Sequence, residues 1–423
     1  MQDRQALHPL NNRANNHALA QPADHPSPPS VRLHYLDALR VLAVLAVFLF
    51  HASKPFTVGG DWRIMNAQTS LVASAFFGAL LAPWGMPFFL LLAGAGTWFA
   101  LQRRSARQFA NERFSRLLIP FVIGSLLFTP IQTFLEWRFA TQADTFAGSF
   151  LDFALERWGG WNPLIFGWIG YHLWFLGFLL TISLIALPLL KWSKGPSGQE
   201  FVSQLAKLCE RRGGILLFAL PLLLIQLILR PFFPESYNWQ DFFYYLLFFL
   251  LGYLFYSDER FVRAIRRDWW LALVVGIVTL LGILTTLAMG DADTLIDTPD
   301  APGFYIFWVF AVIDAWCWSL VMLSIGMRYL DVSNKWLQYG QEAIVPFYVV
   351  HEPIIFAIAF YAVQWETSIL PKMLAVILGS FVVTSAIYIL LVRQVAPLRA
   401  AFGMKAAAHT STVPREEAAP ASR

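Results

Sequence analysis

The chain has 423 residues, of which 57% are hydrophobic and 14% are charged, and its mean hydropathy is +0.54. This composition lies far outside the usual range of soluble domains and indicates a polytopic membrane protein. The 31 Lys and Arg residues barely exceed the 27 Asp and Glu residues, so the charge does not favour a nucleic-acid partner. Two cysteines, Cys209 and Cys317, are too few for a disulfide framework or a zinc site.

Polar segments flank a long apolar region. Residues 1–33 and 401–423 are predicted to be disordered cytoplasmic tails, because they are polar, Ala-rich or charged and lack apolar periodicity. Residues 34–400 are predicted to form one all-α membrane domain of ten transmembrane helices. The ten apolar segments lie near residues 35–53, 73–101, 116–135, 167–190, 214–230, 239–256, 269–289, 303–326, 343–363 and 370–392.

The distribution of basic residues predicts the orientation. Of the 31 Lys and Arg residues, 24 fall in the tails and in the loops near 102–115, 191–213, 257–268 and 327–342. Six fall in the alternate loops, and Arg40 lies within the first segment. The loop at 290–302 contains four Asp residues and no basic residue. Because cytoplasmic loops are enriched in Lys and Arg, we predict ten helices with both termini in the cytoplasm.

The first apolar segment carries three ionisable residues, Asp37, Arg40 and His51. An ionisable group at membrane depth costs about 2–3 kcal/mol or more, so it requires a partner or a function. Arg40 and His51 are eleven residues apart, which on an α-helix is about three turns and about 20° around the axis. We therefore predict that they lie on one face, with Arg40 near the inner surface and His51 near the outer one. In the structural alternative, Arg40 pairs with Asp37 and reaches the headgroups, while His51 caps the helix.

Arg113 and Arg116 follow the second segment and are spaced by one helical turn. Both guanidinium groups are therefore expected to point to one place, which is what binding a phosphate or pyrophosphate requires. The positive-inside bias accounts for the nearby Arg103, Arg104 and Arg107 without further function.

Three histidines lie in the apolar region, namely His51, His172 and His351. His351 is followed by Glu352 and Pro353, and adjacent helical residues do not share a face, so His351 and Glu352 are not expected to form a pair by themselves. Three histidines and a carboxylate predict an internal polar site, in which a histidine is the natural general base at neutral pH. Asp314, in the eighth segment, is interpreted as a structural residue.

Four segments occur in a specific order: Leu36-Asp-Ala-Leu-Arg-Val through Phe50-His51, Met86-Pro-Phe-Phe-Leu-Leu-Leu-Ala-Gly94, Arg113-Phe-Ser-Arg116-Leu-Leu-Ile-Pro120, and Tyr339-Gly340 through Tyr348-Val-Val-His351-Glu352-Pro353. Together they resemble the acyltransferase 3 family of integral membrane O-acyltransferases over about residues 32–400. Pro346 stands where a Ser is common in that family. The segment His172-Leu-Trp-Phe-Leu176 also resembles the branch that includes glucans biosynthesis protein C.

The resemblance implies transfer of an acyl group, of the acetyl or succinyl class, from cytoplasmic acyl-CoA to a hydroxyl of a carbohydrate or glycan on the outer side. It also implies a multi-pass protein of the bacterial inner membrane, with acyl-CoA as donor substrate and no metal. Arg40, Arg113 and Arg116 are expected to bind the CoA phosphates. His51 is expected to take the hydroxyl proton, assisted by His172, His351 and Glu352.

Two other functions remain open at this point. A proton-coupled transporter would use His51, His172, Asp314 and Glu352 as a relay. A non-catalytic membrane partner would leave the internal charges unexplained. Release of CoA thiol that depends on an acceptor would distinguish an enzyme from a transporter, which predicts proton-linked flux.

Overall fold

The computed structural model describes residues 33–58, 62–141, 171–234, 236–290 and 292–404, and every regular element in these ranges is a helix. The chain divides into two units, Met1–Leu33 and His34–Arg423, and every helix of the described residues lies in the second unit. Most of the two predicted tails, and residues 142–170 between the third and fourth predicted segments, lie outside the described residues. The structure therefore supports the all-α class and leaves the state of the tails as a prediction.

Seven helical stretches are long and apolar enough to cross a membrane. Their bounds are His34–Phe56, Leu71–Leu101, Ala106–Ala140, Glu259–Met289, Phe304–Tyr329, Lys335–Ala362 and Ile369–Val392. Three shorter apolar helices span Tyr171–Ile185, Gly214–Leu229 and Trp239–Phe255. Each of the ten predicted apolar segments coincides with one of these stretches. The chain is thus a multi-pass membrane protein, whereas the count of ten crossings and the cytoplasmic placement of both termini stay predictions.

Several of these stretches are built from consecutive helical elements. The elements in chain order are α1 (His34–Ser53), η1 (Lys54–Phe56), α2 (Leu71–Ala73), η2 (Ser74–Leu81), α3 (Ala82–Leu101), α4 (Ala106–Arg113), η3 (Phe114–Leu118), α5 (Ile119–Thr141), η5 (Tyr171–Leu173), α7 (Trp174–Ile185), α8 (Leu187–Trp192), α9 (Pro196–Leu208), η6 (Gly214–Phe218), α10 (Ala219–Leu229), α11 (Trp239–Phe255), α12 (Glu259–Met289), α13 (Ala292–Asp297), α14 (Phe304–Tyr329), α15 (Lys335–Ala362), α16 (Ile369–Ile387), η7 (Tyr388–Val392) and α17 (Ala396–Ala401).

The helix that enters the third predicted segment begins about ten residues earlier than its apolar pattern. Ser105 accepts a hydrogen bond from the Gln108 backbone N–H, and the Gln108 side chain accepts one from the Ser105 N–H. This capping box satisfies two N–H groups that a helix start otherwise leaves unpaired. It starts α4 at Ala106, so that Arg113 and Arg116 lie on a continuous helix, as predicted.

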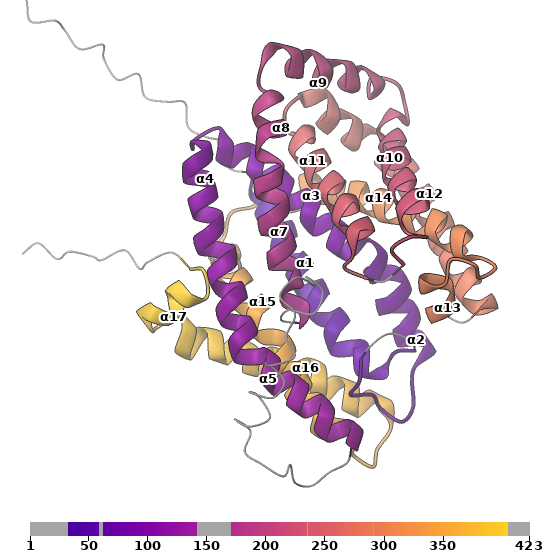
Figure 1. Cartoon of the computed structure of the whole chain (residues 1–423), viewed down its shortest axis with the longest axis vertical. Coiled ribbons are helices and arrows are strands. Elements are labelled where there is room, and N and C mark those ends of the chain that lie inside the picture. The colour runs from indigo at the N-terminus through magenta and orange to yellow at the C-terminus, as the bar shows by residue number, and fades with distance from the viewer. Residues whose placement is uncertain (1–32, 59–61, 142–170, 235, 291, 405–423) are drawn as a thin grey trace, which may run out of the picture. The chain divides into compact units, whose positions relative to one another are not determined.

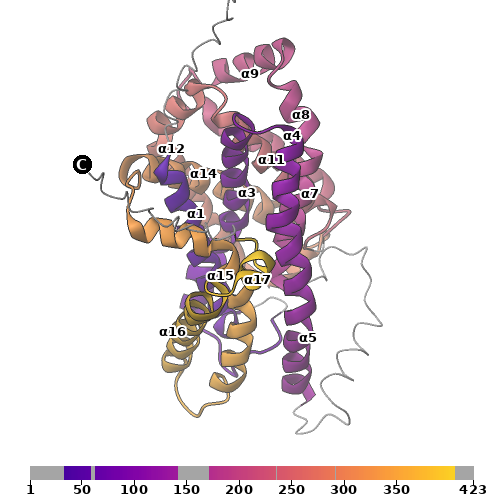
Figure 2. The same cartoon turned by 90° about the vertical axis from the view of Figure 1, so that its left-hand side faces the viewer.

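Helix α1 is the central element of the helical unit. It packs against α3, α14, α15, α16 and η2, and Figure 1 shows α3, α14, α15 and α16 around it. Figures 1 and 2 both place α9 and the start of α4 towards one end of this unit, and the last turns of α5 towards the opposite end. This arrangement brings the two basic loops near 102–115 and 191–213 to the same end, as the charge pattern requires.

Two glycines set the distance between α3 and α11. A Cβ on Gly94 would lie 1.9 Å from the Phe249 carbonyl oxygen, and one on Gly252 would lie 1.9 Å from that of Leu91. Small residues of this kind let two membrane helices approach at the backbone. The close contact fixes α3, which carries the partners of two of the predicted functional arginines.

Candidate active site

Helix α1 carries both Arg40 and His51 without interruption, so the predicted spacing of three turns along one helix is present. His51 lies in the last turn of α1, with 18% of its side chain exposed. Its Nδ1 lies 3.0 Å from Nε2 of His351 on α15. The two rings are nearly parallel, at 19° and 5.2 Å between centroids.

His351 and Glu352 both reach His51, although they are neighbours on α15. Glu352 Oε2 lies 3.6 Å from the same His51 Nδ1. Consecutive helical side chains point about 100° apart, so they meet only a group that lies between their two directions. His51 occupies that position, which the spacing of His351 and Glu352 alone did not predict. Both α15 residues are buried, and Pro353, which follows them, has no N–H to donate within the helix.

His172 joins this group from η5, a single turn that precedes α7. Its Nδ1 lies 3.0 Å from Glu352 Oε2, and its Nε2 lies 2.8 Å from the Tyr348 carbonyl oxygen. The Tyr348 hydroxyl donates in turn to the His172 carbonyl oxygen. We refer to His51, His172, His351 and Glu352 as the histidine cluster. All four were predicted site residues, and the fold brings them together from three separate segments.

The Tyr348 carbonyl oxygen assigns the tautomers of the cluster. It lies 2.7 Å from His351 Nδ1, and a carbonyl only accepts, so His351 Nδ1 carries the proton. In neutral His351 the lone pair is then on Nε2, which accepts the proton of His51 Nδ1. This leaves the lone pair of His51 on Nε2, which makes no hydrogen bond within the described ranges. His51 Nε2 is therefore the nitrogen available to receive a proton.

The same reasoning places one proton between His172 and Glu352. His172 Nε2 must donate to the Tyr348 carbonyl, so the lone pair of a neutral His172 is on Nδ1. That nitrogen and Glu352 Oε2 are 3.0 Å apart, and neither makes a hydrogen bond to any other described residue. Two buried acceptors at this distance repel unless they share a proton. The pair is therefore an imidazolium with a carboxylate, or an imidazole with a carboxylic acid.

Gln132 on α5 is a member of the site that sequence reasoning missed. Its Nε2 donates to Glu352 Oε1 at 3.2 Å, and the residue is 1% exposed. The available signal was a lone amide in the apolar segment Leu-Phe-Thr-Pro-Ile-Gln, since polar groups inside membrane helices usually face a partner.

At the other end of α1, Arg40 contacts two helices. Its Nη1 donates to Asp37 Oδ1 at 2.9 Å and its Nη2 to the Leu92 carbonyl oxygen of α3 at 3.2 Å. The pairing with Asp37 is the one that the structural alternative predicted. Arg113 approaches the same part of α3, because its Nη2 donates to Thr97 Oγ1 at 3.0 Å. The guanidinium of Arg113 also stacks over the Phe109 ring.

Arg116 makes other contacts than Arg113, and the prediction that both bind one phosphate or pyrophosphate stays a prediction. Its Nη1 donates to Glu112 Oε1 at 3.3 Å, and 45% of its side chain is exposed. Glu112, four residues earlier, also binds Arg104 and holds Arg116 on the surface of its own helix. Arg40, Arg104 and Arg116 still lie within electrostatic range of Arg113. Positive charge is therefore concentrated around Arg113, and Arg40 contacts the same part of α3.

A substitution at Gly96 tests whether Arg40 binds the donor, because Gly96 lies against the Arg40 guanidinium. A Cβ at Gly96 would lie 2.5 Å from Arg40 Nη2, so Gly96→Ala must displace the guanidinium while the rest of α3 stays in place. If Arg40 binds the donor, we expect the Michaelis constant for acyl-CoA to rise about tenfold, since one charge-assisted contact contributes about 1.5–3 kcal/mol. Steady-state kinetics of the purified protein measures this. Gly85→Ala is the matched control, because no atom lies within 4 Å of its added Cβ. An unchanged constant in Gly96→Ala would exclude Arg40 from donor binding.

Asp314 does not belong to the histidine cluster. Its Oδ1 accepts hydrogen bonds from Thr279 Oγ1 of α12 at 3.3 Å and from Trp318 Nε1 of α14 at 3.0 Å. The relay of the transporter hypothesis included Asp314 with three cluster residues, and the structure places it in a different helix pair. Its contacts fit the structural role that the sequence favoured.

The ligand atoms of His51, His351 and Glu352 lie within 4.8 Å of one another, which is close enough to hold a metal ion. Two histidines and a carboxylate are also a ligand set that zinc accepts. The hydrogen bonds described above account for the same atoms without an ion, and the prediction that no metal is required stays a prediction.

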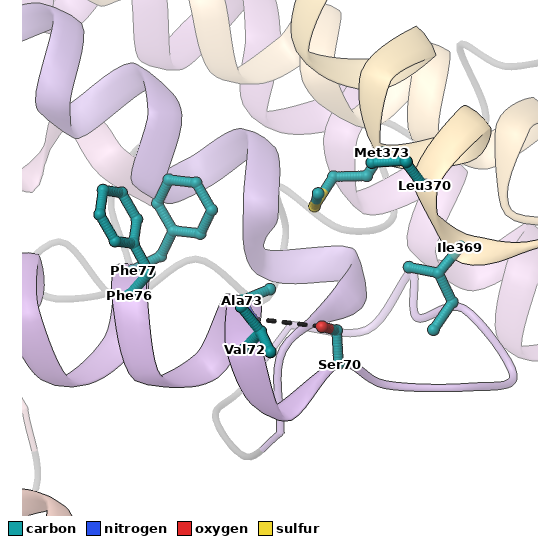
Figure 3. Close-up of a pocket in the computed structure, with 8 residues that line it drawn as sticks. All are labelled: Ser70, Val72, Ala73, Phe76, Phe77, Ile369, Leu370 and Met373. Carbon is teal, nitrogen blue, oxygen red and sulfur yellow. Dashed lines mark hydrogen bonds between the residues drawn. The ribbon is translucent and has the colours of Figure 1, made fainter.

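A cavity of about 390 Å³ lies apart from the cluster. Figure 3 shows its lining, which includes Phe76 and Phe77 of η2 and Leu370 and Met373 of α16. The only hydroxyl among these side chains, that of Ser70, already accepts a hydrogen bond from the Ala73 backbone. A lining of this kind is typical of a lipid-facing surface and offers nothing to a charged donor.

The fold and the cluster define a class of protein. It is a multi-pass membrane protein, helical throughout the described residues, with a buried histidine–carboxylate site at the end of its central helix α1. A family model described as an acyltransferase domain matches residues 33–392. The chain therefore belongs to the acyltransferase 3 family and is a membrane acyltransferase. No curated protein and no solved structure matches the chain. The transporter alternative is set aside, and the resemblance to the glucan branch stays a prediction.

Proposed function

We propose that the protein transfers an acetyl or succinyl group from cytoplasmic acyl-CoA to a hydroxyl of a carbohydrate or glycan on the outer side of the bacterial inner membrane. The observation that carries the proposal is the unpaired Nε2 of His51, whose tautomer is fixed by His351 and the Tyr348 carbonyl. A neutral imidazole nitrogen held in this way is suited to remove a proton from a hydroxyl nucleophile.

In the proposed reaction, His51 Nε2 accepts the hydroxyl proton as the hydroxyl oxygen attacks the thioester carbonyl carbon. The new C–O bond forms, the C–S bond breaks, and the CoA thiolate leaves. The proton on His51 is then available to the thiolate, so the products are the acyl ester and CoA thiol. During this cycle the His51 imidazolium lies 3.6 Å from the Glu352 carboxyl group and 3.0 Å from His351 Nε2, which stabilise its charge.

The donor would bind through the positive charge around Arg113. Arg40 and Arg113 both flank α3 near residues 92–97, and Arg104 and Arg116 add charge at the surface. Phosphate groups bind such clusters through charge-assisted hydrogen bonds. Arg40 and His51 are about 16 Å apart along α1, so the proposal requires the flexible arm of the donor to carry the acyl group over that distance.

The proposed orientation follows from charge. Ten crossings with both termini in the cytoplasm place the Arg113 cluster inside and His51 near the outer surface. The two basic loops at the same end of the helical unit support this assignment.

The proposed function predicts a change in the cell envelope. We expect mass spectrometry of envelope glycans to show a species heavier by one acetyl or succinyl unit in cells that express the protein and not in cells that lack it. Expression of a His51→Gln variant is the matched control. A glycan pool of identical mass in all three strains would contradict the proposed acceptor.

A further inference from the structure

An aromatic side chain lies beside the cluster and has no place in the mechanism above. Trp62, in the loop between η1 and α2, stacks on His51 with 22° between ring planes and 6.3 Å between centroids. Trp62 also contacts Phe356 of α15 in a tilted arrangement, with 4.5 Å between centroids. The indole Nε1 is buried and makes no hydrogen bond to any described residue. A buried indole N–H normally has an acceptor, so this one indicates a missing partner.

The loop that carries Trp62 is firmly attached to the helices. Ile64 is 0% exposed within the apolar core of α1 and α15. The Asn66 N–H donates to the Pro55 carbonyl at 2.8 Å, and the Asn66 side chain accepts from the buried Lys372 at 3.0 Å. The position of Trp62 over His51 is therefore built into the fold.

A second set of polar side chains, Thr133, Glu136, Tyr171 and Arg63, lies next to Trp62 and the histidine cluster. The Tyr171 hydroxyl donates to Glu136 Oε2 at 2.9 Å and lies 3.0 Å from Thr133 Oγ1. Arg63 Nε lies 4.0 Å from the same Glu136 oxygen. The Glu136 side chain is 12% exposed and that of Arg63 is 68% exposed. The group thus runs from the protein interior to an accessible surface.

This polar group adjoins the histidine cluster along two elements. Tyr171 immediately precedes His172, and Glu136 lies one helical turn beyond Gln132, which binds Glu352. Tyr171 has a φ of 52°, a left-handed conformation that is unfavourable for a tyrosine. Strain of this kind persists only when surrounding contacts impose it, and it is common at functional sites.

From these contacts we infer that Trp62, Arg63, Glu136 and Tyr171 form the acceptor subsite, and that it takes a sugar ring. The inference rests on the proposed function and extends it to the residues that recognise the acceptor. The aromatic face of Trp62 matches the apolar face of a pyranose ring, and a ring oxygen or hydroxyl supplies the partner of its N–H. Glu136 and Arg63 match neighbouring hydroxyls as acceptor and donor. A ring held there presents a hydroxyl to His51 Nε2.

The test compares the two Michaelis constants of the purified full-length protein. The probes are acetyl-CoA or succinyl-CoA and the unacylated glycan pool extracted from cells that lack the protein, with CoA thiol release as the measurement. We expect Trp62→Ala to raise the constant for the glycan about tenfold or more and to leave the constant for acyl-CoA within about twofold. Trp62→Phe, which keeps a ring but lacks the N–H, should lie between wild type and Trp62→Ala. Glu136→Gln should also raise only the glycan constant.

Trp365→Ala is the matched control, because Trp365 is exposed at the turn between α15 and α16. A lower kcat with an unchanged glycan constant in Trp62→Ala and Glu136→Gln would show that these residues position His51, which would overturn the subsite. Equal changes in both constants would overturn it as well. If the wild-type protein releases no CoA thiol with this pool, the proposed acceptor class fails, an outcome separate from failure of the subsite.

Discussion

The His51→Gln variant is expected to lose about 100-fold or more in turnover, because general base catalysis contributes about 10²–10⁴-fold. Glutamine can donate to His351 Nε2 as His51 Nδ1 does, so the hydrogen bond between α1 and α15 is retained. It has no nitrogen that accepts a proton at neutral pH. The measurement is CoA thiol release by the purified variant at saturating acyl-CoA and glycan.

His34→Gln serves as the control for this substitution, since it makes the same chemical change at the first turn of the same helix, far from the cluster. Thermal unfolding of both variants verifies that they are folded. If folded His51→Gln turns over at a rate near that of wild type, His51 is not the base, and His172 is the next residue to test.

The Glu352→Gln variant is expected to lose about 10- to 100-fold in turnover with little change in folding. An amide at this position can still accept from Gln132 and donate to His172 Nδ1, so both contacts remain satisfied. What it removes is the acidic group next to the base. At 3.6 Å from His51, a carboxylate stabilises the transient imidazolium by up to about 4–5 kcal/mol at an effective dielectric constant of about 20, and its share after solvation is smaller.

Glu366→Gln, at an exposed position after α15, controls for the loss of a carboxylate charge. Glu352→Ala distinguishes the two contributions of the residue, because it also leaves His172 and Gln132 without partners. We expect it to be less stable than Glu352→Gln, since unsatisfied buried groups cost about 1–3 kcal/mol each. Full turnover in Glu352→Gln would mean that the acidic group has no part in the reaction.

Sequence alone identified the polar residues that a membrane domain must explain. Apolar run lengths and the alternation of basic loops located all ten segments, because lipid imposes both rules on every residue of a helix. Ionisable groups within apolar runs singled out Arg40, His51, His172, His351 and Glu352, because their cost at membrane depth makes them rare. The one-turn spacing of Arg113 and Arg116 added these two arginines.

Only the structure shows which groups the predicted arginines contact. The one-turn spacing of Arg113 and Arg116 predicted that both guanidinium groups point to one place, and the structure adds that Glu112 binds Arg116 on the helix surface. Arg113 instead contacts Thr97 of α3, close to the contacts of Arg40 at Leu92 and Gly96. The spacing of residues along a helix limits which side chains can meet, but it does not show which other side chains compete for the same contact.

What the sequence by itself determined about this protein is therefore its class, its helical segments and a short list of polar residues, since each depends on the local cost of placing a residue in lipid. Only the tertiary structure decided how those residues combine. Gln132 carries no local signal that links it to Glu352, and His172 none that links it to Tyr348, yet these pairs form contacts across 220 and 176 residues of the chain. Tautomers, shared protons and an acceptor surface follow from such contacts, and these form only when the helices pack.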